Sequence, residues 1–168
     1  MGNIKAKTHL QKLGFADSDK KKPTHDTIQT WVYENIQTIV AETAMKNRST
    51  PYELTPAKWE HQVIYYGSKT YKVVVGFVDI YVGVKGIFHF KMSNSDDTYA
   101  EERTKPIYIE VKTEIPSLGE LIRQMRAYQA YHDNFADYII VSPDDRHKKI
   151  LEEQGFHFYK YHDPSKLF

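Results

Sequence analysis

The 168-residue chain contains no cysteine and no long apolar run, and each absence excludes a class of protein. Without cysteine there is no disulfide, no thiolate zinc site and no cysteine nucleophile. The sequence has no stretch of about 18 apolar residues, and its polar, lysine-bearing start has no signal-peptide core. We therefore expect an intracellular, cytoplasmic protein without a membrane segment.

Several catalytic and binding motifs are also missing. No glycine-rich loop precedes a Lys-Ser or Lys-Thr pair, so the chain carries no ATP-driven motor, and it has neither His-Glu-x-x-His nor Gly-x-Ser-x-Gly. The net charge of +1 excludes a strongly basic nucleic-acid coat. The charge is uneven, because residues 1–23 hold six lysines against two aspartates, a net of +4. This segment either contacts the phosphates of a nucleic acid or is a solvated, flexible leader.

What the chain does contain is typical of one globular domain. Hydrophobic residues make up 40% and charged residues 27%, and the 14% aromatic content argues against disorder. A chain of this length fits a single domain with a proper core. We predict a basic, loosely ordered leader over 1–23 and one domain over 24–168.

Patterning along the chain predicts alternating helices and strands. Thr24 is a good N-cap for a helix that ends near residue 47, and Ser117-x-x-Glu120 is a capping box for a second helix. A third helix is predicted over 144–154, and the polar segment 92–105 is predicted to be a loop or insertion. Strands are predicted over 62–66, 71–84, 87–91, 107–113, 137–141 and 156–161, and Gly83 and Gly86 are predicted to flank a turn between the second and third of these. This order predicts a mixed α/β sheet with helices on its faces.

Three charged residues interrupt the apolar strands, where a charge is costly unless it has a function. Asp79 ends Gly76-Phe-Val-Asp79, and Glu110 and Lys112 lie within a run of isoleucine, tyrosine and valine. Because side chains alternate along a strand, Glu110 and Lys112 project together, whereas their neighbours point into the core. The same alternation predicts that Val78 and Ile80 share the face opposite Asp79.

Two carboxylates on neighbouring strands can hold a cation. If Asp79 and Glu110 converge, their oxygens with water and a phosphate oxygen suit Mg²⁺ or Mn²⁺. A lysine beside such an ion, here Lys112, can orient the attacking water. The alternative is that Asp79 merely ends a strand and that Glu110 and Lys112 form an ion pair on a solvated sheet.

The set Gly76-Phe-Val-Asp79, Glu110-Val-Lys112-Thr113 and Gln124-x-x-x-Tyr128 resembles the PD-(D/E)xK nuclease superfamily, most closely its RecB-type branch. The resemblance implies a restriction-endonuclease-like fold with an αβββαβ core and Mg²⁺- or Mn²⁺-dependent hydrolysis of DNA. It further implies that Asp79 and Glu110 are metal ligands and that Lys112 positions the water. Gln124 and Tyr128 would then shape the site beside the incoming strand.

The chain departs from the superfamily pattern in three places. Val78 replaces the usual proline, and a long segment, 86–105, is inserted between the two acidic motifs. Many members also take an acidic residue from the first helix or nearby. Three candidates are available, and the sequence does not choose among Glu34, Glu42 and Glu60.

Two other functions compete with a nuclease. One is a catalytically silent nucleic-acid-binding or assembly module on the same fold, and the other is an interaction domain with an aromatic surface. Within the nuclease hypothesis, exonuclease, junction resolvase and transposon- or restriction-type endonuclease all remain open. Since the chain has no motor, we expect it to reach DNA through a protein partner, a homodimer or a DNA structure.

Overall fold

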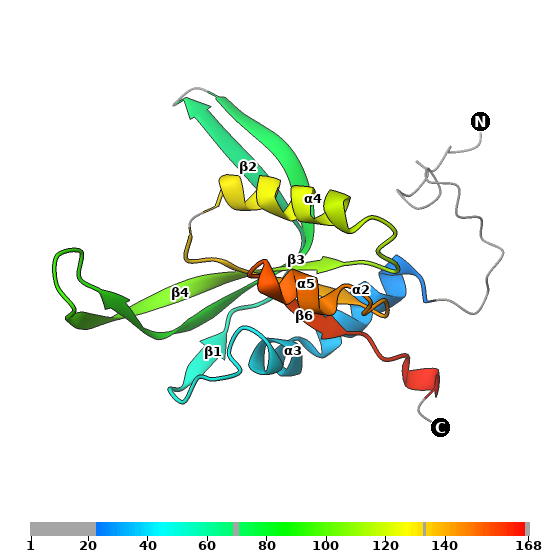
Figure 1. Cartoon of the computed structure of the whole chain (residues 1–168), viewed down its shortest axis with the longest axis horizontal. Coiled ribbons are helices and arrows are strands. Elements are labelled where there is room, and N and C mark those ends of the chain that lie inside the picture. The colour runs from blue at the N-terminus through cyan, green and yellow to red at the C-terminus, as the bar shows by residue number, and fades with distance from the viewer. Residues whose placement is uncertain (1–22, 69–70, 133, 167–168) are drawn as a thin grey trace.

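A computed structural model describes residues 23–68, 71–132 and 134–166 (Figure 1). The basic leader expected over 1–23 therefore lies, except for Pro23, outside the described residues. The described chain forms a six-stranded sheet in the order β1-β3-β4-β5-β6, and β2 pairs with β3 outside this path. The strands are β1 (Tyr52–Leu54), β2 (Lys58–Ser68), β3 (Tyr71–Lys91), β4 (Thr98–Val111), β5 (Asp137–Ser142) and β6 (His157–Lys160).

The sheet is mixed. β1 and β2 pair with β3 in antiparallel register, as does β4, whereas β4, β5 and β6 run parallel to one another. A parallel pair needs a crossover connection, and helices provide both of these crossovers. The predicted α/β class, with helices packed on a mixed sheet in the order αβββαβ, is confirmed.

The helices begin largely where the caps predict and end earlier than expected. They are α2 (His25–Glu34), α3 (Ile36–Glu42), α4 (Leu118–Ala130) and α5 (Lys148–Glu153), followed by the 3₁₀ turn η1 (Pro164–Lys166). The Thr24 and Ser117 side chains accept bonds from the Thr27 and Glu120 amides, so both predicted caps are confirmed. The single helix predicted over 24–47 is wrong, because Asn35 leaves helical geometry and its side chain binds the Trp31 carbonyl. No helix of the described ranges is long and apolar enough to cross a membrane.

β3 is longer than predicted, because the glycines at 83 and 86 do not form a turn. Pairing with β4 runs without a break from Ile80↔Ile109 to Lys91↔Thr98. A Cβ on Gly83 would lie 2.6 Å from Thr104 Cγ2, so this glycine is needed for close packing within the sheet. The segment 92–105 is therefore mostly strand rather than loop, and only 92–97 connects β3 to β4.

β3 bends at Asp79. β2 pairs Trp59 with Ile80 and His61 with Val78, but Glu60 and Asp79 between them are unpaired, and Glu60 has a φ of 47°. Val78 and Ile80 pack into different hydrophobic clusters, so the prediction that they share a face is wrong. Beyond the bend, residues 62–68 and 71–78 form a two-stranded ribbon, here called the β2–β3 arm, which rises away from the rest of the sheet (Figure 1).

Two hydrophobic clusters cover the two faces of the sheet. The first cluster joins α2 and α3 to Ile107, Ile109 and Val111 of β4, which point into the core as predicted. The second cluster joins α4 and α5 to the opposite face. Each fully buried aliphatic side chain contributes about 1.5–3 kcal/mol relative to exposure, so the clusters fix both helical layers. Glu110 lies on the α4 side, between these layers and the pocket described below.

The loop from β4 to α4 is held by Asp144, whose carboxylate accepts a 2.8 Å bond from the Ile115 amide and pairs with Arg146. We expect Asp144→Ala to lower the free energy of unfolding by about 1–2 kcal/mol, because it leaves a buried N–H unpaired. Urea unfolding at pH 7 measures the change. Asp145→Ala is the matched control, since its ion pair with Lys160 is exposed. Equal effects of the two substitutions would contradict this role for Asp144.

Candidate active site

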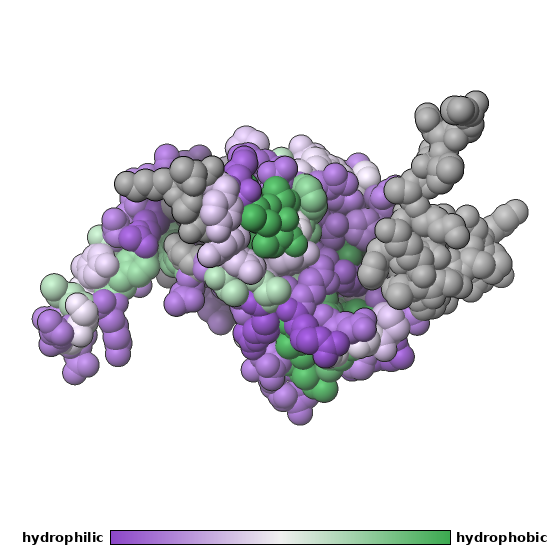
Figure 2. All heavy atoms as spheres, turned by 90° about the horizontal axis from the view of Figure 1, so that it is seen from above, coloured by the Kyte–Doolittle hydropathy of each residue, from purple (hydrophilic) through white to green (hydrophobic). Residues whose placement is uncertain are grey.

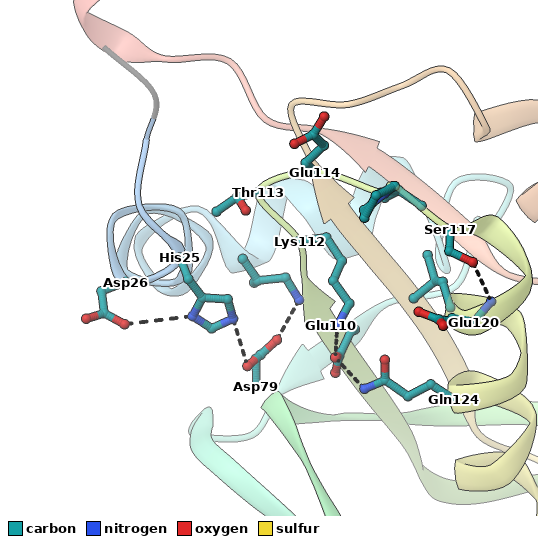
Figure 3. Close-up of a pocket in the computed structure, with 14 residues that line it drawn as sticks. His25, Asp26, Asp79, Glu110, Lys112, Thr113, Glu114, Ser117, Glu120 and Gln124 are labelled. Carbon is teal, nitrogen blue, oxygen red and sulfur yellow. Dashed lines mark hydrogen bonds and ion pairs between the residues drawn. The ribbon is translucent and has the colours of Figure 1, made fainter. Parts of the chain in front are cut away.

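A pocket of about 520 Å³ opens where the bend of β3, the end of β4 and the N-termini of α2 and α4 meet (Figure 3). The chain contributes carboxylates to it from all four segments. Only one lysine, Lys112, and one histidine, His25, offset them among the lining residues. The lining carboxylates are Asp26, Asp79, Glu110, Glu114 and Glu120. The pocket is therefore strongly acidic, which favours cations over anions.

Asp79 is held from two sides. Its Oδ2 accepts a 2.7 Å bond from the Val111 amide of β4, and its Oδ1 lies 3.1 Å from His25 Nε2 at the start of α2. One helical turn further on, the buried Gln29 amide donates a 2.9 Å bond to the Asp79 carbonyl. Because Asp79 is unpaired in the β2–β3 ladder, the Gln29 bond gives its carbonyl the partner that β2 does not supply.

Glu110 is buried, with 4% of its surface exposed. Its Oε1 accepts bonds of 2.8 Å from both Lys112 Nζ and Gln124 Nε2. Its Oε2 is buried and has no hydrogen-bond partner among the described residues. A buried acceptor of this kind costs free energy unless something binds it. Glu110 therefore presents an unused carboxylate oxygen at the pocket.

Gln124 and Tyr128 extend this network along α4. The Gln124 amide also donates a 3.0 Å bond to the Tyr128 hydroxyl, which in turn donates to the Phe77 carbonyl at 3.2 Å. A Cβ on Gly76 would lie 2.9 Å from Tyr128 Cε1, so glycine at this position lets the ring approach the arm. The helix thus connects the Glu110 carboxylate to the strand that carries Asp79.

The five residues that the resemblance assigns to the site lie close together in the structure. Two of them come from the adjacent strands β3 and β4, one follows β4, and two lie one turn apart on α4. The predicted residues that the structure brings together are Asp79, Glu110, Lys112, Gln124 and Tyr128.

The surroundings shift the pKa of four titratable groups in and beside the pocket, which are His25, Glu110, Lys112 and Tyr128. Burial, and then repulsion from Asp79, raise the pKa of Glu110 to about 7. Burial opposes the charge on Lys112, but the attraction and hydrogen bond of Glu110 outweigh it, so the pKa of Lys112 is raised. The hydrogen bond to Asp79 raises the pKa of His25 despite its partial burial. Burial also raises the pKa of Tyr128.

The donors fit a hard divalent cation. Asp79 and Glu110 destabilise each other as anions, and Glu110 Oε2 has no partner, so a cation between them would relieve both costs. Within the described ranges, no three or more His, Asp or Glu side chains are grouped to hold a metal ion. The protein would therefore supply two carboxylate ligands, and water or substrate would occupy the remaining coordination positions of the cation, as is usual for Mg²⁺.

The first helix contributes residues that sequence reasoning missed. His25 and Gln29 are four residues apart and so share one face of α2; this spacing is visible in the sequence, but their partner Asp79, 50 or more residues away, is not. The acidic residues expected from the sequence to complete the site do not reach it. Glu34, Glu42 and Glu60 are exposed, and none of them lines the pocket. The N-terminus of α2 faces Asp79, so only residues of its first two turns can reach the site.

The two arginines of α4 do not line the pocket. Arg126 donates to the Gln154 carbonyl at 2.8 Å and lies over the Phe156 ring, so it ties α4 to the end of α5. Arg123 is exposed and stays available to solvent or to a ligand.

The sequence matches no protein-family model and no curated protein. A solved structure titled "Structure of EndoMS in apo form" is similar to this chain, with 15% sequence identity and a TM-score of 0.40. The similarity covers 86% of this chain and 48% of that one, so this chain spans about half the length of that protein. A likeness at this level says nothing about activity, and the geometry of the site carries the functional conclusion.

The raised pKa of Glu110 predicts a pH-dependent stability of the metal-free protein. The folded state holds this proton to about pH 7, whereas the unfolded chain releases it near pH 4.5. Stability from this group is complete below pH 4.5 and is lost as the pH rises through 7. In EDTA, we expect the thermal midpoint to fall between pH 5 and 8, and Glu110→Gln to flatten this fall. If the thermal midpoint of Glu110→Gln falls with pH as steeply as that of the wild type, Glu110 is not the group that causes the fall.

Proposed function

We propose that this protein is a metal-dependent nuclease of the PD-(D/E)xK type that hydrolyses phosphodiester bonds in DNA. The observation that carries the proposal is the meeting of Asp79 and Glu110 from adjacent strands, with Lys112 bound to Glu110 and one Glu110 oxygen unpaired. Mg²⁺ or Mn²⁺ is the proposed cofactor, and Asp79 and Glu110 are its proposed ligands.

A divalent cation at this place would neutralise charge on the scissile phosphate and lower the pKa of a bound water. Lys112 has a raised pKa and is therefore protonated at neutral pH. It can donate hydrogen bonds that orient the water or a phosphate oxygen, but it cannot take the proton from that water. The Val111 amide keeps Asp79 turned toward Glu110, so the two carboxylates stay close without a ligand.

The finer assignment to the RecB-type branch depends on Gln124 and Tyr128. Gln124 uses both amide hydrogens, one on Glu110 and one on Tyr128, so it fixes the carboxylate rather than reacting. Tyr128 has a raised pKa and stays neutral, which suits a residue that shapes the site. DNA is proposed rather than RNA because the sequence contains no recognised RNA-binding motif.

Cleavage of labelled single-stranded, double-stranded and branched DNA in Mg²⁺, Mn²⁺ or EDTA tests the proposed reaction. We expect cutting only with metal, and a loss of at least about 100-fold in Asp79→Asn and in Lys112→Met, since each removes a group that contacts the reacting atoms. Asp145→Asn and Lys148→Met are matched controls at exposed positions. Binding without cutting, unchanged by these substitutions, would instead support the catalytically silent module.

Gln29 is proposed as a positioning residue for Asp79. Gln29→Leu keeps the side-chain size but removes the bond to the Asp79 carbonyl, so the bend that presents the carboxylate loses one of its supports. We expect Mn²⁺ affinity, measured by calorimetry without DNA, to fall by about 3- to 10-fold. Gln37→Leu on the exposed face of α3 is the control. Unchanged Mn²⁺ affinity in Gln29→Leu would rule out this role.

A further inference from the structure

The β2–β3 arm exposes a large apolar surface. Its exposed side chains are mostly aromatic or β-branched, and Tyr66 is the most exposed of them at 71%. Figure 2, which looks down on this side of the molecule, shows an apolar patch open to solvent near the middle of the view. The exposed large side chains of the arm are Tyr65, Tyr66, Tyr71, Val73, Val74, Val75 and Phe77.

Only one face of the arm is covered by the rest of the chain. Val63 is buried in the cluster beneath α4, and Tyr65 contacts the Tyr131 ring at the end of that helix, with the ring centroids 5.4 Å apart. By alternation along the strands, Tyr66 and Val74 point to the other face. A two-stranded ribbon is marginally stable alone in water, so an uncovered apolar face favours a partner.

The charges on the arm favour a protein partner over nucleic acid. Residues 62–78 contain two lysines, Lys69 and Lys72, and no acidic residue. A phosphate-binding ribbon requires several cationic side chains, because neutralising phosphates supplies most of the affinity. Lys72 pairs with Tyr66 and so lies on the uncovered face, where it is the single described charge. Such a surface can meet a copy of itself with little like-charge repulsion when the twofold axis keeps the two copies of Lys72 apart.

The exposed area and a free strand edge both contribute to such a pair. Fully exposed aromatic side chains present about 150–250 Å² each, so the four on the arm, with the three valines, leave on the order of 500 Å² uncovered in each copy over both faces of the arm. The face of Tyr66, Val74 and Phe77 supplies about half of this area, so packing of that face alone would bury on the order of 500 Å² in the two copies together, and the rest of the ~1,000 Å² of a specific interface must come from pairing of the strand edges. The outer edge of β3 before Ile80 also has no strand partner within the described ranges, so backbone pairing can add to the contact.

We propose that two copies of this chain form a twofold dimer by packing their β2–β3 arms together. The face that carries Tyr66, Val74 and Phe77 forms the centre of the contact. This inference does not depend on the nuclease proposal, because the arm residues of the contact do not line the acidic pocket. The dimer would carry two such pockets, one at the foot of each arm.

Sedimentation equilibrium of the full chain between about 1 and 100 µM tests the dimer. We expect a dimer in wild type and a monomer in Tyr66→Lys/Val74→Lys, because like charges would then meet across the axis. Ile87→Lys is the control, since Ile87 is 50% exposed but lies on the other half of β3. Circular dichroism confirms that each variant is folded.

The lysine substitutions also separate this proposal from other readings. The added positive charge of Tyr66→Lys/Val74→Lys does not by itself weaken DNA binding. If this variant is monomeric and still binds DNA, the arm is a contact between protein copies. A wild type that stays monomeric at 100 µM overturns the proposal, and so does a dimer that only Ile87→Lys disrupts. A monomer whose DNA affinity falls in Tyr66→Ala would identify the arm as a nucleic-acid surface instead. Metal-dependent cleavage, measured separately, decides the nuclease proposal in each case.

Discussion

The burial of one carboxylate, Glu110, is the constraint on which the candidate site depends. Removing this group from water favours its protonated form, and the neighbouring Asp79 adds repulsion. Lys112 and Gln124 compensate only one of its oxygens, at 2.8 Å each. The Glu110 carboxylate at the end of β4 is therefore only partly compensated, and α4 packs with Gln124 of its polar face against it. Such an arrangement is costly for a purely structural protein and suits one that binds a cation there.

The bend of β3 links the site to the rest of the molecule. At Asp79 the strand leaves the main sheet, and one residue supplies both a side chain for the pocket and a carbonyl for Gln29. The same bend lifts the β2–β3 arm, while the Tyr33 and Trp59 rings stack 5.0 Å apart and fasten α2 to β2. The position of α2 therefore affects both the pocket and the root of the arm, so a change in either can reach the other through this strand.

Local patterns predicted much of the site, and long-range contacts supplied the rest. Alternation along a strand placed Glu110 and Lys112 together, and the spacing of four on a helix paired Gln124 with Tyr128, because both rules act within a few residues. His25 was missed because its partner lies more than 50 residues away. The glycine at 83 was read as a turn signal, whereas the structure uses its missing side chain to admit Thr104 from the neighbouring strand. Sequence periodicity does not distinguish these two uses of glycine.

The acidic pocket also limits how a nuclease of this kind could hold DNA. Five carboxylates line it, and Lys112 is already paired with one of them, so the pocket alone repels a phosphate backbone. Bound cations would have to offset the negative charge of the pocket before a phosphate could enter it. In a nuclease of this kind, metal would therefore be needed for DNA to approach as well as for the reaction. The remaining affinity must come from surfaces outside the pocket. A twofold dimer would place two such pockets on one substrate, and two weak contacts on one molecule bind far more tightly than either alone.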